Sequence, residues 1–143
     1  MISLVMATYN GEKYLYEQLD SIRCQTMPPD EVIICDDCSK DSTVNMIQKY
    51  IDKYQLKHWN VYENEKIKDI QRILVMSLKL AKGDIIFLAD QDDIWMLDKI
   101  EKMTDIMTSN ESIELLASNV KPFYMGSDPR KVNYEKLKAK KKL

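Results

Sequence analysis

The sequence is poor in cysteine and histidine, and it has no long hydrophobic run. Its 143 residues include three cysteines and one histidine. So few cysteines, in an odd number, are typical of free thiols in a reducing compartment. We assign no role to His58, which we expect on a loop or strand edge. Residues 1–6 carry no basic segment and polar residues follow at once, which argues against a signal peptide or spanning helix there. We therefore expect the chain as given to be cytoplasmic.

Neither sign of charge is in large excess. The formal net charge of -2 gives no long-range attraction to nucleic acid. Residues 136–142 hold five lysines, a composition more typical of a solvated chain end than of a membrane or nucleic-acid contact. We expect one domain over residues 1–120, followed by a poorly packed, lysine-rich end over residues 121–143. This end would be the point where a larger protein was cut.

The hydrophobic pattern alternates between two periods along the chain. Apolar residues recur at helical spacing within residues 15–22, 44–51, 70–81 and 96–107. Segments of strand character occupy residues 2–7, 31–36, 60–62, 84–89 and 113–117. This alternation predicts an α/β fold with a mostly parallel central sheet and helices on both faces. The runs 2–6 and 85–88 are almost wholly apolar, so we expect them in the middle of the sheet.

Carboxylates cluster just beyond two of these strand segments. Asp90, Asp92 and Asp93 follow one apolar run, and Asp36 and Asp37 follow another. Two carboxylates about 4 Å apart repel by roughly 4 kcal/mol at an effective dielectric constant of 20, so the first cluster needs a cation or a shifted pKa. Oxygen ligands favour Mg²⁺ or Mn²⁺, with the remaining ligands supplied by a diphosphate. The alternative is that Asp92 or Asp93 caps a helix that begins near Trp95.

The second acidic segment also has two interpretations. Asp36 or Asp37 could accept hydrogen bonds from a base or a ribose, because carboxylates only accept. Alternatively, the segment is an Asx turn before a helix that Asp41 and Ser42 begin. Cys35 and Cys38 match the C-x-x-C spacing of redox and zinc sites, but no second cysteine pair exists and the flanking acids disfavour a thiolate. We expect both cysteines to be structural.

Three motifs follow one another along the chain. Residues 2–15, with Thr8-Tyr9-Asn10-Gly11, are followed by residues 36–43, with Asp36-Asp37, and then by residues 80–100, with Asp90-Gln91-Asp92-Asp93. Together they resemble the amino-terminal half of family 2 glycosyltransferases, the inverting enzymes of the Rossmann-like GT-A fold. The similarity is strongest to the bacterial branch that builds surface polysaccharides and includes rhamnosyltransferase-like enzymes. It covers roughly residues 1–120.

This resemblance implies a hexosyltransferase-type reaction. A sugar would pass with inversion from a UDP-, dTDP- or GDP-linked donor to a glycan or lipid-linked acceptor. The resemblance places Mn²⁺ or Mg²⁺ on Asp92 and Asp90. The general base would lie in an acceptor-binding half beyond this chain. It further implies a homodimer or a peripheral contact of the full-length protein with the inner face of the membrane. By position, the nucleotide-sugar site would comprise Thr8, Tyr9, Asn10, Glu12, Asp36, Asp37, Asp90, Gln91, Asp92, Asp93 and Trp95.

Two other functions compete with this one. The chain could be a non-catalytic nucleotide-binding or partner module. A phospho-acceptor receiver domain would also combine an α/β sheet with an acidic pocket, but its acidic pair would follow the first strand. Here the first strand ends in Thr8-Tyr9-Asn10.

Overall fold

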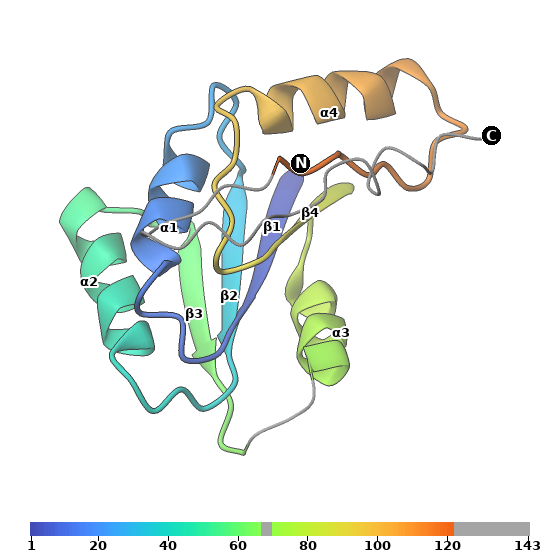
Figure 1. Ribbon diagram of the computed structural model, residues 1–143. Helices are drawn as coiled ribbons and strands as arrows, with labels where there is room; N and C mark the ends of the chain where they lie inside the picture. The colour runs from blue at the N-terminus through green and yellow to red at the C-terminus, as the bar shows by residue number, and fades with distance from the viewer. Residues whose placement is uncertain (67–69, 122–143) are drawn as a thin grey trace.

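A computed structural model describes residues 1–66 and 70–121 of the protein. Its strands and helices alternate along the chain, as the sequence predicts (Figure 1). In chain order they are β1 (Ile2–Thr8), α1 (Leu15–Arg23), β2 (Glu31–Asp36), α2 (Thr43–Tyr54), β3 (Trp59–Glu63), α3 (Ile70–Leu80), β4 (Ile85–Ala89) and α4 (Lys99–Ser109). Except for Lys121, the lysine-rich end expected over residues 121–143 lies outside the described residues.

The sheet is parallel and has the order β3-β2-β1-β4. β1 pairs with a parallel strand on each side, so that Thr8 lies opposite Asp36 of β2 and Met6 lies opposite Ala89 of β4. The chain crosses from β1 to β2 in one direction and from β3 to β4 in the other. In such sheets ligands bind at the carboxyl ends of the strands, where the strand order reverses. This edge lies at the bottom of Figure 1.

Helices cover both faces of the sheet, which confirms the expected α/β architecture. On one face α1, α2 and α4 pack over the larger apolar cluster, which includes Leu19, Ile34, Ile47 and Ile100, all fully buried. On the other face α3 packs through Ile73 against a smaller cluster formed by Val5, Ile33 and Cys35. All the residues of β2 are buried, because helices cover both faces of the sheet at this strand.

Polar contacts hold the amino-terminal edge of the sheet together. Glu31 accepts hydrogen bonds from the Ser3 hydroxyl (2.6 Å) and the Lys82 amide (2.7 Å), and the Gly83 amide donates to Ser3 Oγ (2.7 Å). A Cβ on Gly83 would lie 2.7 Å from the backbone oxygen of Met1, so only glycine fits there. These contacts fix the start of β4 beside β1.

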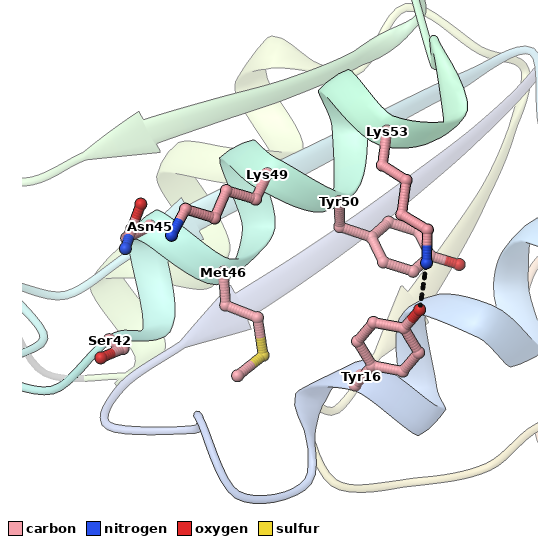
Figure 2. Close-up of a pocket in the computed structure, with 7 residues that line it drawn as sticks. All are labelled: Tyr16, Ser42, Asn45, Met46, Lys49, Tyr50 and Lys53. Carbon is pink, nitrogen blue, oxygen red and sulfur yellow. Dashed lines mark hydrogen bonds between the residues drawn. The ribbon is translucent and has the colours of Figure 1, made fainter.

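A groove of about 370 Å³ separates the outer faces of α1 and α2 (Figure 2). Beneath it Tyr50 donates a hydrogen bond to Asp20, and Arg23 forms an ion pair with the same carboxylate (2.9 Å). The hydrogen bond from Tyr50, followed by the contacts with Arg23, lowers the pKa of Asp20. At the rim Lys53 donates to the Tyr16 hydroxyl (3.1 Å). None of the predicted site residues lines this groove.

Two sequence expectations are wrong. Residues 113–117 form no strand among the described residues: the Ile113 amide closes a turn onto Asn110 (3.0 Å), and Leu115 is 88% exposed. Their strand-like composition lacks a neighbouring strand to pair with. β4 is an edge strand of the described sheet rather than a central one, and its side chains Ile86 and Leu88 are 38% and 50% exposed.

No helix within the described ranges is long and apolar enough to cross a membrane.

Truncation of Leu19 tests how much the larger cluster contributes to stability. Leu19→Ala removes a fully buried side chain between α1 and the sheet, and we expect a loss of about 2–5 kcal/mol in the free energy of unfolding. Urea denaturation followed by circular dichroism measures it. The matched control, Leu115→Ala, should change the value by less than about 0.5 kcal/mol. Equal losses in the two variants would contradict the described core.

Candidate functional site

Three of the loops that leave the carboxyl edge of the sheet carry the predicted site residues: residues 9–14 after β1, residues 37–42 after β2 and residues 90–98 after β4. Thr8 lies where the first two loops leave the sheet, and its hydroxyl donates a hydrogen bond to Asp36 Oδ2 (2.8 Å) across the paired strands. The Asn10 amide donates to Ser39 Oγ (2.8 Å), and the Lys40 amide donates to Asn10 Oδ1 (2.8 Å). The loops after β1 and β2 therefore form one bonded unit.

Asp36 is committed to holding this unit. It is 1% exposed and accepts hydrogen bonds from the Ser39 amide (2.8 Å), the Ser39 hydroxyl (2.6 Å) and Thr8. The bond to Ser39 three residues on is the local turn that the alternative interpretation described. Glu12 has a similar part, since its carboxylate accepts from the Ser42 amide (2.7 Å) at the start of α2. Both predicted ligand contacts are thus loop contacts in this structure.

Asp37 lies next to the end of β3. The Asn64 side-chain amide approaches Asp37 Oδ1 at 3.4 Å, and the Asp37 backbone amide donates to the Thr8 carbonyl (2.9 Å). A carboxylate and a primary amide side by side offer the acceptor and donor groups that a nucleobase edge pairs with. Asp37 is 6% exposed, so it is buried almost as fully as Asp36.

The acidic loop after β4 presents its carboxylates unevenly. Asp90 and Asp92 are exposed, whereas Asp93 is half-buried. Burial, followed by the charges of Asp90 and Asp92, raises the pKa of Asp93. A cation would relieve that repulsion, and two exposed carboxylates leave room for phosphate oxygens in the shell of a divalent ion. No group of three metal-binding side chains gathers within the described residues. Asp90 and Asp92 therefore fit a site completed by the substrate.

Trp95 is largely buried under the acidic loop and lines a hollow beside it. It is 5% exposed, and its ring packs near Phe87, with ring centroids 6.0 Å apart. Its backbone amide donates to Ser21 Oγ (3.0 Å), which ties the acidic loop to α1. The Lys99 ammonium lies 3.9 Å from the centroid of the Trp95 ring. Trp95 therefore supports the loop, and its predicted place towards the donor sugar or the acceptor stays a prediction.

A hollow of about 650 Å³ lies beside this support, and Asp93 and Lys99 line part of it. Lys99 is half-buried, and burial lowers its pKa while the charges of Asp93 and Asp90 act in the opposite direction. The Lys99 ammonium group therefore lies near the carboxylates of Asp93 and Asp90. Sequence reasoning gave Lys99 no role, although its spacing of four residues from Trp95 was visible.

The capping alternative for the acidic loop is wrong. α4 begins at Lys99, and the residue before it is Asp98, so neither Asp92 nor Asp93 lies at its first turn. The buried Ile100 amide, in the first turn of α4, instead donates to Gln25 Oε1 (3.0 Å), which follows α1. The expectation for α2 holds in part: Asp41, two residues before the helix, accepts from the Thr43 amide (3.0 Å), whereas the N-cap residue Ser42 makes no side-chain cap bond.

The cysteines behave as structural residues. All three lie within the described residues and none forms a disulfide. Cys35 is buried in β2, and Cys38 donates through its thiol to the Asn64 carbonyl (2.7 Å). Sequence reasoning gave no role to Asn64, whose side-chain amide approaches Asp37 from the end of β3, 27 residues further along the chain.

The chain matches a family of known proteins. The family model for glycosyl transferase family 2 matches residues 3–142. The chain belongs to this family. That result excludes the receiver-domain interpretation and confirms the resemblance drawn from the three motifs. The GT-A fold expected from the resemblance is likewise that of the matching solved structures.

Two curated relatives illustrate the range of the family. The chain is 29% identical to the Escherichia coli UDP-Glc:alpha-D-GlcNAc-diphosphoundecaprenol beta-1,3-glucosyltransferase WfgD, over 96% of this chain and 54% of the relative. It is 36% identical to the Shigella flexneri dTDP-rhamnosyl transferase RfbG, over 83% of this chain and 42% of the relative. The chain thus spans about half the length of these relatives, which are bacterial glycosyltransferases.

Solved structures match the fold over most of the chain. TarS residues 1–349 from Staphylococcus aureus, solved in complex with UDP, has a TM-score of 0.66 and 29% identity, over 77% of this chain and 32% of that one. The mannosyltransferase PcManGT from Pyrobaculum calidifontis, solved with GDP-Man and Mn²⁺, has a TM-score of 0.70 at 24% identity, over 74% of this chain and 32% of that one.

Neutralising Asp93 should stabilise the metal-free protein. The pKa of Asp93 is raised above its ordinary value of 3.8, so the folded state disfavours its charged form. The penalty is complete above the folded-state pKa and disappears below the unfolded-state value. Asp93→Asn should therefore raise the melting temperature at pH 7 in EDTA, with no gain near pH 3.5.

Thermal melts across this pH range make the comparison. Asp105→Asn, at an exposed position of α4, serves as the matched control and should leave the melting temperature nearly unchanged. A melting temperature for Asp93→Asn at or below that of the unaltered protein at pH 7 would contradict the described crowding of carboxylates.

Proposed function

We propose that this chain is the donor-binding domain of a bacterial glycosyltransferase that moves a sugar from a nucleotide diphosphate to a glycan or lipid-linked acceptor in surface polysaccharide synthesis. The observation that carries the proposal is the meeting of three polar loops at the reversal point of a parallel sheet, with two exposed carboxylates on one of them. The activities for which the relatives are named, those of a glucosyltransferase and a rhamnosyl transferase, support the reaction type.

The nucleotide would lie over the ends of β1, β2 and β3. Asp37 and Asn64 offer the acceptor and donor groups for its base, and Tyr9 presents an aromatic ring that is 47% exposed. Thr8, Asn10, Glu12 and Asp36 would shape the loops that border the nucleotide. Complexes of TarS with UDP and UDP-GlcNAc support a nucleotide-sugar ligand at this fold.

The diphosphate would lie beside the acidic loop. Asp92, with Asp90, would hold Mn²⁺ or Mg²⁺, which as a Lewis acid would neutralise the leaving diphosphate. The Mn²⁺ complex of PcManGT is consistent with this choice. Asp93 would face the hollow that it shares with Lys99, and it would lie nearest the sugar or the acceptor.

The reaction needs one more group. An acceptor hydroxyl would attack the anomeric carbon with inversion, the bond to the diphosphate oxygen would break, and a general base would take the hydroxyl proton. Outside the metal loop, Glu63 and Glu65 are exposed carboxylates at the carboxyl end of β3, and no contact described for them orients either one as this base. We therefore infer that the base belongs to an acceptor-binding part outside these residues. The same observation favours a second candidate, a nucleotide-binding module that does not catalyse transfer by itself.

Calorimetric titration of UDP and dTDP, with and without Mn²⁺, tests the donor site. We expect binding that requires Mn²⁺, and we expect Asp92→Asn to weaken it at least about tenfold by removing a charged ligand. Asp105→Asn is the control, and a thermal melt verifies that both variants fold. Metal-dependent affinity that survives in Asp92→Asn would remove Asp92 from the site.

The two candidates differ in turnover. Hydrolysis or transfer of a bound nucleotide sugar by this chain alone would favour the enzyme, whereas binding without turnover would favour the donor-binding module. Failure of both nucleotides to bind with Mn²⁺ would contradict the donor site itself.

A further inference from the structure

The side chain of Gln91 joins the acidic loop to the loop after β1. Its Oε1 accepts a hydrogen bond from the Tyr9 amide (2.9 Å), and its Nε2 donates to the Tyr9 carbonyl (3.1 Å). Both polar atoms of the carboxamide are therefore engaged by the backbone of one residue. Only a side chain that carries a donor and an acceptor together can make this pair of bonds.

This contact continues the strand pairing where the backbone stops. The pairing of β1 with β4 ends at Met6 and Ala89, and β1 itself ends at Thr8. Beyond that point the Tyr9 backbone would face the departing loop without a strand beside it. The Gln91 carboxamide supplies a donor and an acceptor in place of the next strand residue, so the two loops stay together past the end of the sheet.

Gly11 encloses the carboxamide from the other side. A Cβ on Gly11 would lie 2.8 Å from Gln91 Cδ, which is too close for any other residue unless the carboxamide moves. Gly11 is buried, and its amide donates to Thr43 Oγ1 (2.8 Å), so the backbone has little freedom to withdraw. Gln91 is thus held between two fixed backbone segments.

Gln91 connects the loop proposed to hold the metal with the loop proposed to border the nucleotide. Its neighbours on either side are Asp90 and Asp92, the two exposed carboxylates proposed to hold the metal. Its partner, Tyr9, carries the exposed ring proposed to border the nucleotide. Holding the Gln91 side chain therefore sets the position of the metal loop relative to the nucleotide loop.

We propose that Gln91 is a positioning residue that couples metal binding to nucleotide binding by clamping the acidic loop onto the Tyr9 backbone, rather than a residue that contacts the donor. The proposal rests on the proposed function, because it concerns the same two ligands. In thermodynamic terms, Mn²⁺ and UDP should each strengthen the binding of the other, and part of that coupling should pass through Gln91.

Gln91→Met tests the clamp with little change in volume. It removes both hydrogen bonds and keeps an unbranched side chain against Gly11. Loss of two hydrogen bonds that hold the loops together should weaken UDP binding at saturating Mn²⁺ about tenfold. It should also reduce the factor by which UDP strengthens Mn²⁺ binding, and we expect the melting temperature to stay within about 2 °C.

Two further variants separate the clamp from a general effect of substitution. Gln91→Glu can accept from the Tyr9 amide but, when ionised, places charge against the Tyr9 carbonyl, so it should reduce the coupling as Gln91→Met does. Gly11→Ala displaces the same carboxamide from the opposite loop and should reproduce the defect. Gln48→Ala is the control, because Gln48 lies exposed on α2 and bonds only to Asp52 (3.1 Å) among the contacts described for it.

Calorimetry of Mn²⁺ alone, UDP alone and each in the presence of the other gives the coupling factor. Amide hydrogen exchange at Tyr9, followed by NMR, reports the clamp independently of ligand, and exchange should quicken in Gln91→Met. Unchanged coupling in Gln91→Met would overturn the proposal, whether or not Tyr9 exchange changes. If the unaltered chain binds neither Mn²⁺ nor UDP, the proposed function fails and the positioning role fails with it. If it binds both without coupling, only the positioning role fails.

Discussion

The parallel pairing of β1 on both of its sides is the constraint on which the rest of the structure depends. It sends the loops after β1, β2 and β4 out of the same edge of the sheet. It also places Thr8 opposite Asp36, which allows the hydroxyl of one strand to bond the carboxylate of the next. The polar contacts among these three loops, including that between Gln91 and Tyr9, follow from this shared exit.

Much of this arrangement was predictable from the sequence. Apolar runs that end in polar clusters identify the strands and their carboxyl ends, and the helical periods identify the covering helices. The uses of individual carboxylates were only partly predictable. The bond of Ser39 to Asp36 is local, and the turn that the sequence offered as an alternative anticipates it. The bond of the Ser42 amide to Glu12 joins two loops, and it depends on a tertiary distance that no local pattern encodes. Residues 113–117 fail for a similar reason, because strand propensity does not supply a partner.

Charge at the candidate site is divided between two layers. The outer layer holds the exposed carboxylates Asp90 and Asp92, which water screens. The inner layer holds Asp93, Lys99 and the buried ring of Trp95, where burial shifts the pKa values of Asp93 and Lys99 in opposite directions. Burial disfavours both charges, while each charge favours the other. The inner layer is therefore a pair whose members depend on one another, beneath carboxylates that are open to a ligand.

The outer edge of β4 has a consequence for handling the protein. Within the described residues this strand pairs only with β1, and Ile86 and Leu88 expose apolar surface on the face next to its free edge. An open strand edge with apolar side chains is a template for another extended segment. Concentrated solutions of the isolated chain are therefore prone to edge-to-edge association, and a lysine in place of Leu88 would act as a gatekeeper that favours a dispersed protein.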